Sequence, residues 1–117
     1  MVKRERIELG EEIRIFSPLE EKIMEFLWEK KEATLSEIAK GVNASMSSVA
    51  ATLDRLEKNG FVRKEKKSVD GRRKFVFYPA VSKKDVEVNF VQSILDRLID
   101  KFGDVVVDYF YKRVERK

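Results

Sequence analysis

The 117-residue sequence contains no cysteine and no histidine. The chain therefore has no disulfides, no thiol nucleophile, no imidazole base and none of the usual zinc ligands. This excludes most hydrolase and metalloenzyme classes. The carboxylates that remain stand among lysines and arginines on expected helix surfaces, where charged side chains are usually only solvated. We expect a protein that is not an enzyme and that binds no cofactor.

Long apolar runs are also absent. No run of roughly 18 consecutive apolar residues occurs, and no apolar segment follows the charged start of the chain, so the sequence shows neither a membrane span nor a signal peptide. Hydrophobic residues still make up 43% of the chain, which is enough to build a core. We expect one small cytoplasmic domain with extensions and no membrane contact.

Positive charge is concentrated in one segment. Residues 61–84 contain nine lysines and arginines and only two acidic residues, whereas the segments on either side are close to neutral. A local excess of positive charge suits a surface that follows nucleic-acid phosphates, because each neutralised phosphate releases counterions. An ordinary solvated hairpin explains the charge run equally well when it is considered alone.

The first helix signal follows an N-terminal extension. Residues 5–16 alternate apolar and polar side chains around Gly10, which predicts a short hairpin or one bent strand. Ser17 followed by Pro18 and two glutamates predicts a helix that starts here and runs to about Lys31.

The next segment has the spacing of a helix-turn-helix. Residues 34–37 form a capping box for a short helix that breaks within residues 41–44. Ser45 can cap a third helix that runs to Lys58 and ends at Asn59-Gly60. A rotation of about 100° per residue puts the apolar side chains of this third helix on one face. The opposite side then carries Ser47, Ser48, Ala51 and Arg55.

Two β-rich runs follow, at residues 61–66 and 74–78, and Asp70-Gly71 between them signals a tight turn. We expect a basic β-hairpin. A fourth helix is predicted over residues 83–101, with a wide apolar face. Residues 105–111 have strand-like propensity but follow a helix cap, so their class stays open between helix and strand.

Three helices followed by a hairpin constitute the winged-helix arrangement, in which the third helix enters the major groove of DNA and the hairpin reaches the adjoining backbone. The basic run falls on that hairpin, which favours double-stranded DNA over plain solvation. For Thr34 and Ser45, helix capping is the alternative role, and for Arg55 an intramolecular salt bridge. The candidate DNA-binding residues are Thr34, Ser45, Ser47, Ser48, Ala51 and Arg55 on the helices, and Lys64, Lys66, Arg72, Arg73 and Lys74 on the hairpin.

We therefore predict a mainly α protein with a small β-hairpin. It consists of an N-terminal extension over residues 1–16, a winged helix-turn-helix domain over 17–81 and a C-terminal helical dimerisation extension over 82–117. The last segment carries more apolar surface than the small winged domain can cover. This surface predicts a homodimer through Phe90, Val91, Ile94, Leu95, Leu98, Phe102, Val106 and Phe110.

Several segments, in order, resemble the penicillinase and copper-responsive repressors (BlaI/MecI/CopY type). They are Phe16–Glu20, Ile23-Met24, Leu27-Trp28, Ala33–Ile38, Thr52–Val62, Gly71-Arg72, Phe77–Pro79 and Val81-Ser82. The resemblance implies a homodimeric transcriptional repressor whose C-terminal helices form the dimer and whose wings and recognition helices bind a palindromic operator. It also implies that residues 105–111 are helical.

The chain departs from the family pattern where effectors act. Antibiotic-sensing members are cleaved at an Asn-Phe bond in the dimer region, and the resemblance puts Asp108-Tyr109 at the corresponding place in this sequence. The chain does contain an Asn-Phe pair, Asn89-Phe90, but this pair lies too early in the sequence to correspond. Copper-responsive members carry a cysteine cluster, which this chain lacks. The resemblance therefore implies no inducer. A different class of function, a winged-helix protein-interaction module of a transcription or replication assembly, remains the alternative.

Overall fold

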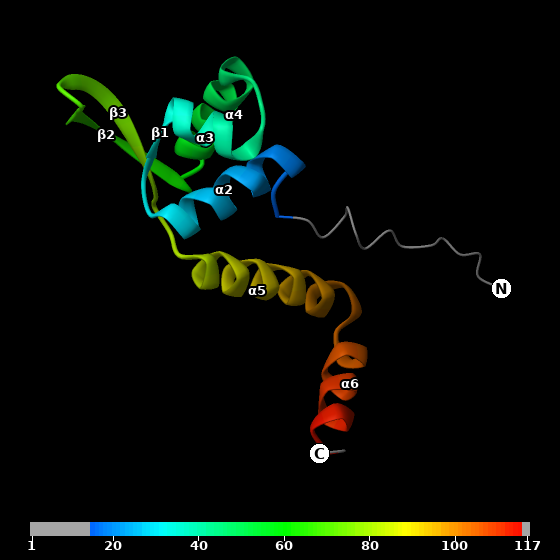
Figure 1. The fold of residues 1–117 in the computed structure, drawn as a ribbon. Helices are drawn as coiled ribbons and strands as arrows, with labels where there is room; N and C mark the ends of the chain where they lie inside the picture. Colours follow the sequence, from blue (N-terminus) through cyan, green and yellow to red (C-terminus); the bar gives the residue numbers. More distant parts are fainter. Residues whose placement is uncertain (1–14, 116–117) are drawn as a thin grey trace. The chain divides into compact units, whose positions relative to one another are not determined.

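The computed structural model describes residues 15–115 and places five helices and three strands in them (Figure 1). The chain divides into two compact units, the first ending at Ser82 and the second beginning at Lys83. The predicted hairpin or bent strand over residues 5–16 lies almost entirely outside the described residues. Within those residues, no helix is both long enough and apolar enough to cross a bilayer.

The first unit begins with α2, Pro18–Lys30, which forms the centre of the core. The Ser17 hydroxyl accepts a hydrogen bond from the Glu20 amide at 3.3 Å, and the Glu20 carboxylate accepts one from the Ser17 amide at 2.9 Å. This reciprocal pair satisfies amides that the first helical turn leaves without partners. The helix ends before Lys31, whose φ is 78°. The predicted start and end are both confirmed.

The second helix, α3 (Leu35–Val42), is preceded by a short strand, β1 (Ala33–Thr34). The predicted capping box is confirmed, because the Thr34 hydroxyl accepts from the Glu37 amide and the Glu37 carboxylate accepts from the Thr34 amide. Gly41 lies inside the helix, which ends at Asn43 in the left-handed conformation, φ 57°. Strand β1 was not predicted. Two residues carry no periodicity, and only their pairing with a distant strand defines them.

The third helix, α4, spans Met46–Lys58 and is capped by the Ser45 hydroxyl, which accepts from the Ser48 amide at 3.1 Å. It ends before Asn59, and Gly60 takes the positive φ, 86°, that reverses the chain. Its inner side packs with α2 and α3. The fully buried core side chains of the unit are Ile23, Met24, Leu27, Ile38, Val49, Leu53 and Leu56.

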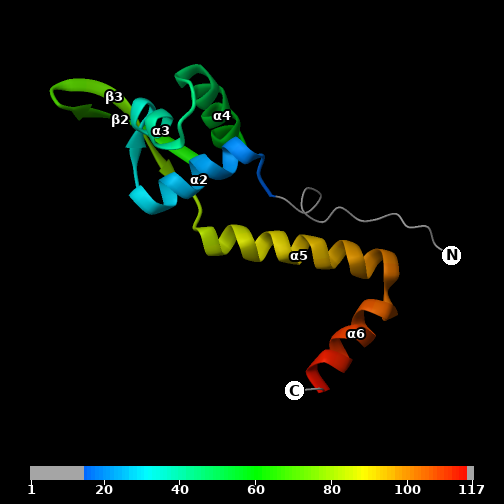
Figure 2. The ribbon, with the colours of Figure 1, turned by 45° about the vertical axis from the view of Figure 1, so that its right-hand side comes forward.

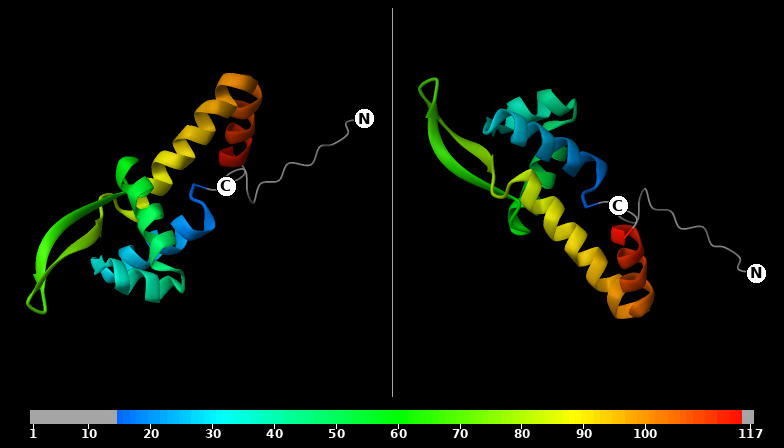
Figure 3. Two further views of the ribbon diagram at one scale, coloured as in Figure 1. Left: turned by 90° about the horizontal axis from the view of Figure 1, so that it is seen from above. Right: turned by 90° about the horizontal axis from the view of Figure 1, so that it is seen from below.

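The hairpin consists of β2 (Val62–Val69) and β3 (Arg72–Pro79). Asp70 and Gly71 form the turn with φ values of 53° and 79°, the two positive angles that a tight hairpin turn requires. Both strands are longer than predicted, since backbone pairing continues through polar residues as far as this turn. With β1 they form an antiparallel sheet in the order β1-β3-β2. The hairpin projects away from the helices of its unit (Figures 2 and 3).

Aromatic side chains fix the two ends of the first unit, which we call the winged-helix unit: the segment before α2 and the segment after β3. Phe16 packs edge-on against Phe61, with ring centroids 5.0 Å apart, and lies 6.4 Å from Trp28. The Trp28 indole donates a hydrogen bond to the carbonyl of Val81 at 2.9 Å. Trp28 is half-buried, and its polar end fixes the segment that follows β3.

The second unit contains α5 (Lys83–Phe102) and α6 (Asp104–Glu115), joined at Gly103 with φ 56°. Residues 105–111 are helical, as the resemblance implies, and their strand-like propensity is overridden. Only Val86 is buried in α5, and no residue of α6 is buried. Two helices can cover each other along only one side, so most of the apolar surface of this unit stays in contact with solvent.

Candidate nucleic-acid interface

The outer face of α4 is lined by small side chains. Ser47, Ser48 and Ala51 are exposed there, as predicted, and Ala50 and Asp54 lie on the same face. The last two were missed although the same 100° rotation places them next to Ser47, at the edge of the predicted set. A face of alanines and serines lets a helix backbone approach a groove closely, and a carboxylate can accept a hydrogen bond from a cytosine amino group.

A cluster of three hydroxyls lies at the N-terminus of α4. The Ser45 hydroxyl donates to the Ser48 hydroxyl at 3.0 Å and lies 3.4 Å from the Ser47 hydroxyl. The exposed hydroxyls can still exchange these partners for a phosphate or a base edge. The positive end of the helix favours an anion at the same place.

Two residues predicted to bind DNA make hydrogen bonds or an ion pair with other residues of the protein. Thr34 is only 7% exposed, and its hydroxyl is used in the capping box of α3. Arg55 lies 3.7 Å from the Glu20 carboxylate and donates to the Thr52 hydroxyl at 3.3 Å. Both residues therefore have the intramolecular partners that the sequence left open as alternatives. Arg55 is still largely exposed at the surface beside Ser48.

The hairpin, which we call the wing, carries ion-paired cations on its basal half. Arg63 pairs with Glu65 at 2.9 Å, Lys64 with Glu57 of α4 at 3.5 Å, and Lys67 with Glu32 at 3.4 Å. Lys64 was predicted as a DNA-binding residue, and its charge is partly balanced by this carboxylate. These pairs are exposed, so each contributes little to stability and exchanges readily.

The cations near the turn of the wing have no such partners. Among residues 15–115, no ion pair includes Arg72, Arg73, Lys74 or Lys66. All four side chains are exposed. The uncompensated positive charge of the wing is therefore at its outer half, which the projecting hairpin carries away from the acidic residues of the helices.

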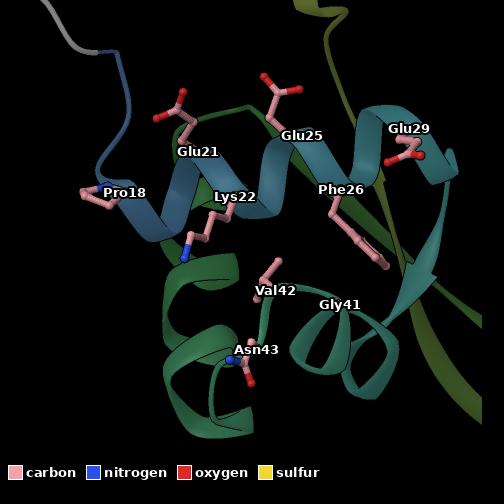
Figure 4. A pocket seen from close by; sticks show the side chains of 9 residues that line it. All are labelled: Pro18, Glu21, Lys22, Glu25, Phe26, Glu29, Gly41, Val42 and Asn43. Carbon is pink, nitrogen blue, oxygen red and sulfur yellow. The ribbon is translucent and has the colours of Figure 1, made fainter.

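A hollow of about 600 Å³ in the same unit lies between α2 and the end of α3 (Figure 4). Its apolar floor includes Phe26 and Val42, and Glu21, Glu25 and Glu29 stand along α2 at its edge. Glutamates spaced four residues apart on one helix make a negative surface. This edge repels a phosphate backbone, so the side of the unit that suits nucleic acid is the one that bears α4 and the wing.

The sequence model of the penicillinase repressor matches residues 16–115, which includes both units. The chain belongs to the penicillinase repressor family. It is thus a transcriptional regulator of a repressor family, with the winged-helix fold and a DNA-binding function. No curated protein matches its sequence significantly.

Solved structures show the same fold for this repressor-family chain. It is similar to a transcriptional regulator homologue from Pyrococcus horikoshii OT3, with a TM-score of 0.57 and 22% identity over 78% of this chain and 93% of that one. It is also similar to a possible transcriptional regulator from Methanosarcina mazei Go1, with a TM-score of 0.58 and 14% identity over 80% of this chain and 79% of that one. The comparison with the adhesin competence repressor AdcR from Streptococcus pyogenes gives a TM-score of 0.51 and 21% identity over 92% of this chain and 82% of that one.

Proposed function

We propose that this protein is a cytoplasmic homodimeric repressor that binds a palindromic operator. The observation that carries the proposal is the combination, on one side of the winged-helix unit, of a small-residue helix face and a wing whose outer cations lack carboxylate partners. A helix of this kind can enter the major groove, and flexible basic side chains on a hairpin can reach phosphates.

The two elements have different roles in this proposal. Ser47, Ser48 and Ala51 on α4 contact base edges, a thymine methyl group or nearby phosphates. Arg72, Arg73 and Lys74 of the wing neutralise phosphates and supply affinity that does not depend on sequence. None of the α4 residues offers the bidentate contact of arginine or glutamine, so each base is discriminated modestly.

The exposed apolar surface of α5 and α6 supports the homodimer. Val91 and Phe102 are each 52% exposed in the single chain, and Phe110 is 45% exposed. Apolar patches of this extent on a soluble protein usually mark an interface. A second copy of the chain is the partner that the family indicates, and a twofold dimer would present two α4 helices to two half-sites.

Footprinting on sequences selected for binding tests this proposal. We expect protection of two inverted half-sites about one helical turn apart, or a multiple of it, and an affinity that falls steeply with salt. Replacing both Arg72 and Arg73 with alanine should lower the salt slope by about four, since each of the two protomers loses two phosphate contacts. A monomer that binds no duplex even at low salt would instead favour the protein-interaction module.

A further inference from the structure

The two faces of the wing differ in how their basal cations are paired with carboxylates. Residues opposite each other on paired strands share a face, and neighbours along a strand alternate. The pairing of Lys66 with Phe75 and of Arg63 with Tyr78 therefore defines two faces. The Phe75 face carries Lys64, Lys66, Arg73 and Phe75; the Tyr78 face carries Arg63, Glu65, Lys67, Arg72, Lys74 and Tyr78.

The cations on the basal half of the Tyr78 face are neutralised. Glu65 accepts hydrogen bonds from Arg63 at 2.9 Å and from the Tyr78 hydroxyl at 3.2 Å. Lys67 donates to Glu32 at 3.4 Å. The Tyr78 side chain, and then Glu32, raise the pKa of Lys67 above its ordinary value. Two cations and two carboxylates form a network here, which leaves little net charge for a phosphate.

The Phe75 face has no comparable set of carboxylates. Its central feature is the Phe75 ring, 43% exposed, with the ammonium of Lys64 4.7 Å and that of Lys66 5.0 Å from the ring centroid. The face of an aromatic ring attracts a cation at such distances. Of these two lysines only Lys64 also has a carboxylate nearby, Glu57. One exposed ring therefore gathers two positive charges side by side.

The Phe75 face is also the side of the wing that meets α4. The Lys64 ammonium lies 3.5 Å from the carboxylate of Glu57, which belongs to α4. Glu32, the partner of Lys67 on the opposite face, instead precedes β1. We expect DNA that receives α4 in its major groove to pass this face of the wing.

We propose that Phe75 is a positioning residue for DNA binding, which holds Lys64 and Lys66 over its ring so that the Phe75 face lies along the phosphodiester backbone. The inference rests on the proposed function and adds to it a residue and a face. A phosphate displaces no tight partner from Lys66, and an ammonium already held in place loses less rotational freedom on binding. Leucine would keep the apolar character of position 75 but provide no ring for the lysines.

The test is the affinity of the full chain for a mixed-sequence DNA duplex, measured over a range of salt concentrations. Lys66→Ala should weaken binding several-fold and lower the salt slope by about two, since each protomer of the dimer loses one phosphate contact. The matched control on the other face, Lys67→Ala, should change neither quantity appreciably. Equal losses from both substitutions would overturn the assignment of the face.

The role of the ring is tested by Phe75→Leu and Phe75→Tyr. We expect Phe75→Leu to weaken binding roughly threefold to tenfold while the fold survives, and Phe75→Tyr to restore it. Lys66→Ala should cost less affinity in the Phe75→Leu background than in the original protein, since the ring no longer positions the lysine. Additive effects, or a Phe75→Leu variant that binds like the original protein, would refute the positioning role.

Arg73→Ala separates this inference from the proposed function. If Arg73→Ala weakens DNA binding while the Phe75 and Lys66 variants do not, the regulator binds DNA by another part of the wing and only this inference fails. If the unaltered chain binds no duplex at low salt, the proposed function itself fails. Thermal unfolding followed by circular dichroism shows that each variant is folded at the temperature of the binding measurement.

Discussion

Gly41 lies inside α3 where the Phe26 ring of α2 reaches across to it (Figure 4). A Cβ atom at position 41 would stand 2.7 Å from Cδ1 and 2.8 Å from Cζ of the ring, and closer still to Cε1. Glycine lowers helix stability relative to alanine, so this position gives up helix propensity for close packing. This contact holds the central helix α2 against α3, the first helix of the helix-turn-helix.

We predict that Gly41→Ala destabilises the protein by about 1–2 kcal/mol, because the cost of overpacking exceeds the gain in helix propensity. Urea unfolding followed by circular dichroism measures the change. The control is the same substitution in a Phe26→Ala background, where the clash is gone and Gly41→Ala should stabilise by roughly 0.5–1 kcal/mol. A Gly41→Ala protein more stable than the original would show that the ring moves aside at little cost.

At the scale of elements, the proposed function gives α4 and the wing separable contributions to binding. The outer face of α4 is lined in its N-terminal half by the small residues Ser47, Ser48, Ala50 and Ala51, whereas the wing carries long cations on a projecting hairpin. A bulky side chain on α4 changes the fit to base pairs. Loss of one cation from the wing changes the number of neutralised phosphates.

We predict that Ala51→Leu lowers affinity for selected operator sequences by about 1–3 kcal/mol while affinity for mixed-sequence DNA is retained. Arg73→Ala should weaken both by the same factor and reduce the salt slope by about two, one phosphate contact for each protomer of the dimer. Parallel titrations of the two kinds of duplex distinguish these outcomes. If Ala51→Leu weakened both duplexes equally, α4 would be a backbone-binding element and the sequence preference would have another origin.

Local signals in the sequence determined most elements of the first unit. The capping residues Ser17, Thr34 and Ser45 and the turn at Asp70-Gly71 act within a few residues of their own position, and the structure has all four features. Strand β1 and the full length of the hairpin depend on pairing between distant residues. Short-range patterns carry no such information.

The candidate site was predictable to the same extent. Periodicity identified the outer face of α4, and composition identified the wing. The sequence could not show that Arg55 lies beside Glu20 or Lys64 beside Glu57, because the fold alone brings these elements together. It could have indicated Phe75, since counting outward from the Asp70-Gly71 turn pairs this residue with Lys66. The DNA-binding roles themselves remain predictions.

At the scale of the whole molecule, the proposed dimer decides how tightly an operator is held. In α5 and α6 the large exposed hydrophobic residues include Leu98, 38% exposed, and Val105, 70% exposed. Packing such residues against a second copy would remove them from water and stabilise the association. Two linked DNA-binding units then engage two half-sites, and the second contact is made at a high effective concentration.

We predict that Leu98→Glu dissociates the dimer, because a carboxylate would be buried without a partner in the interface. Light scattering at micromolar concentration should change from twice the chain mass to the chain mass. Gln92→Glu adds the same charge to α5 at an exposed polar position and should leave the dimer intact.

The same substitution should change DNA binding without touching a DNA-binding residue. A monomer holds one half-site at a time, so Leu98→Glu should lower affinity for the full operator on the order of 10²- to 10⁴-fold. Its affinity for an isolated half-site should stay close to that of the Gln92→Glu control, since neither substitution lies in α4 or the wing. Unchanged affinity of a proven monomer for the full operator would mean that each chain acts alone, and the apolar surface of α5 and α6 would then serve a different partner.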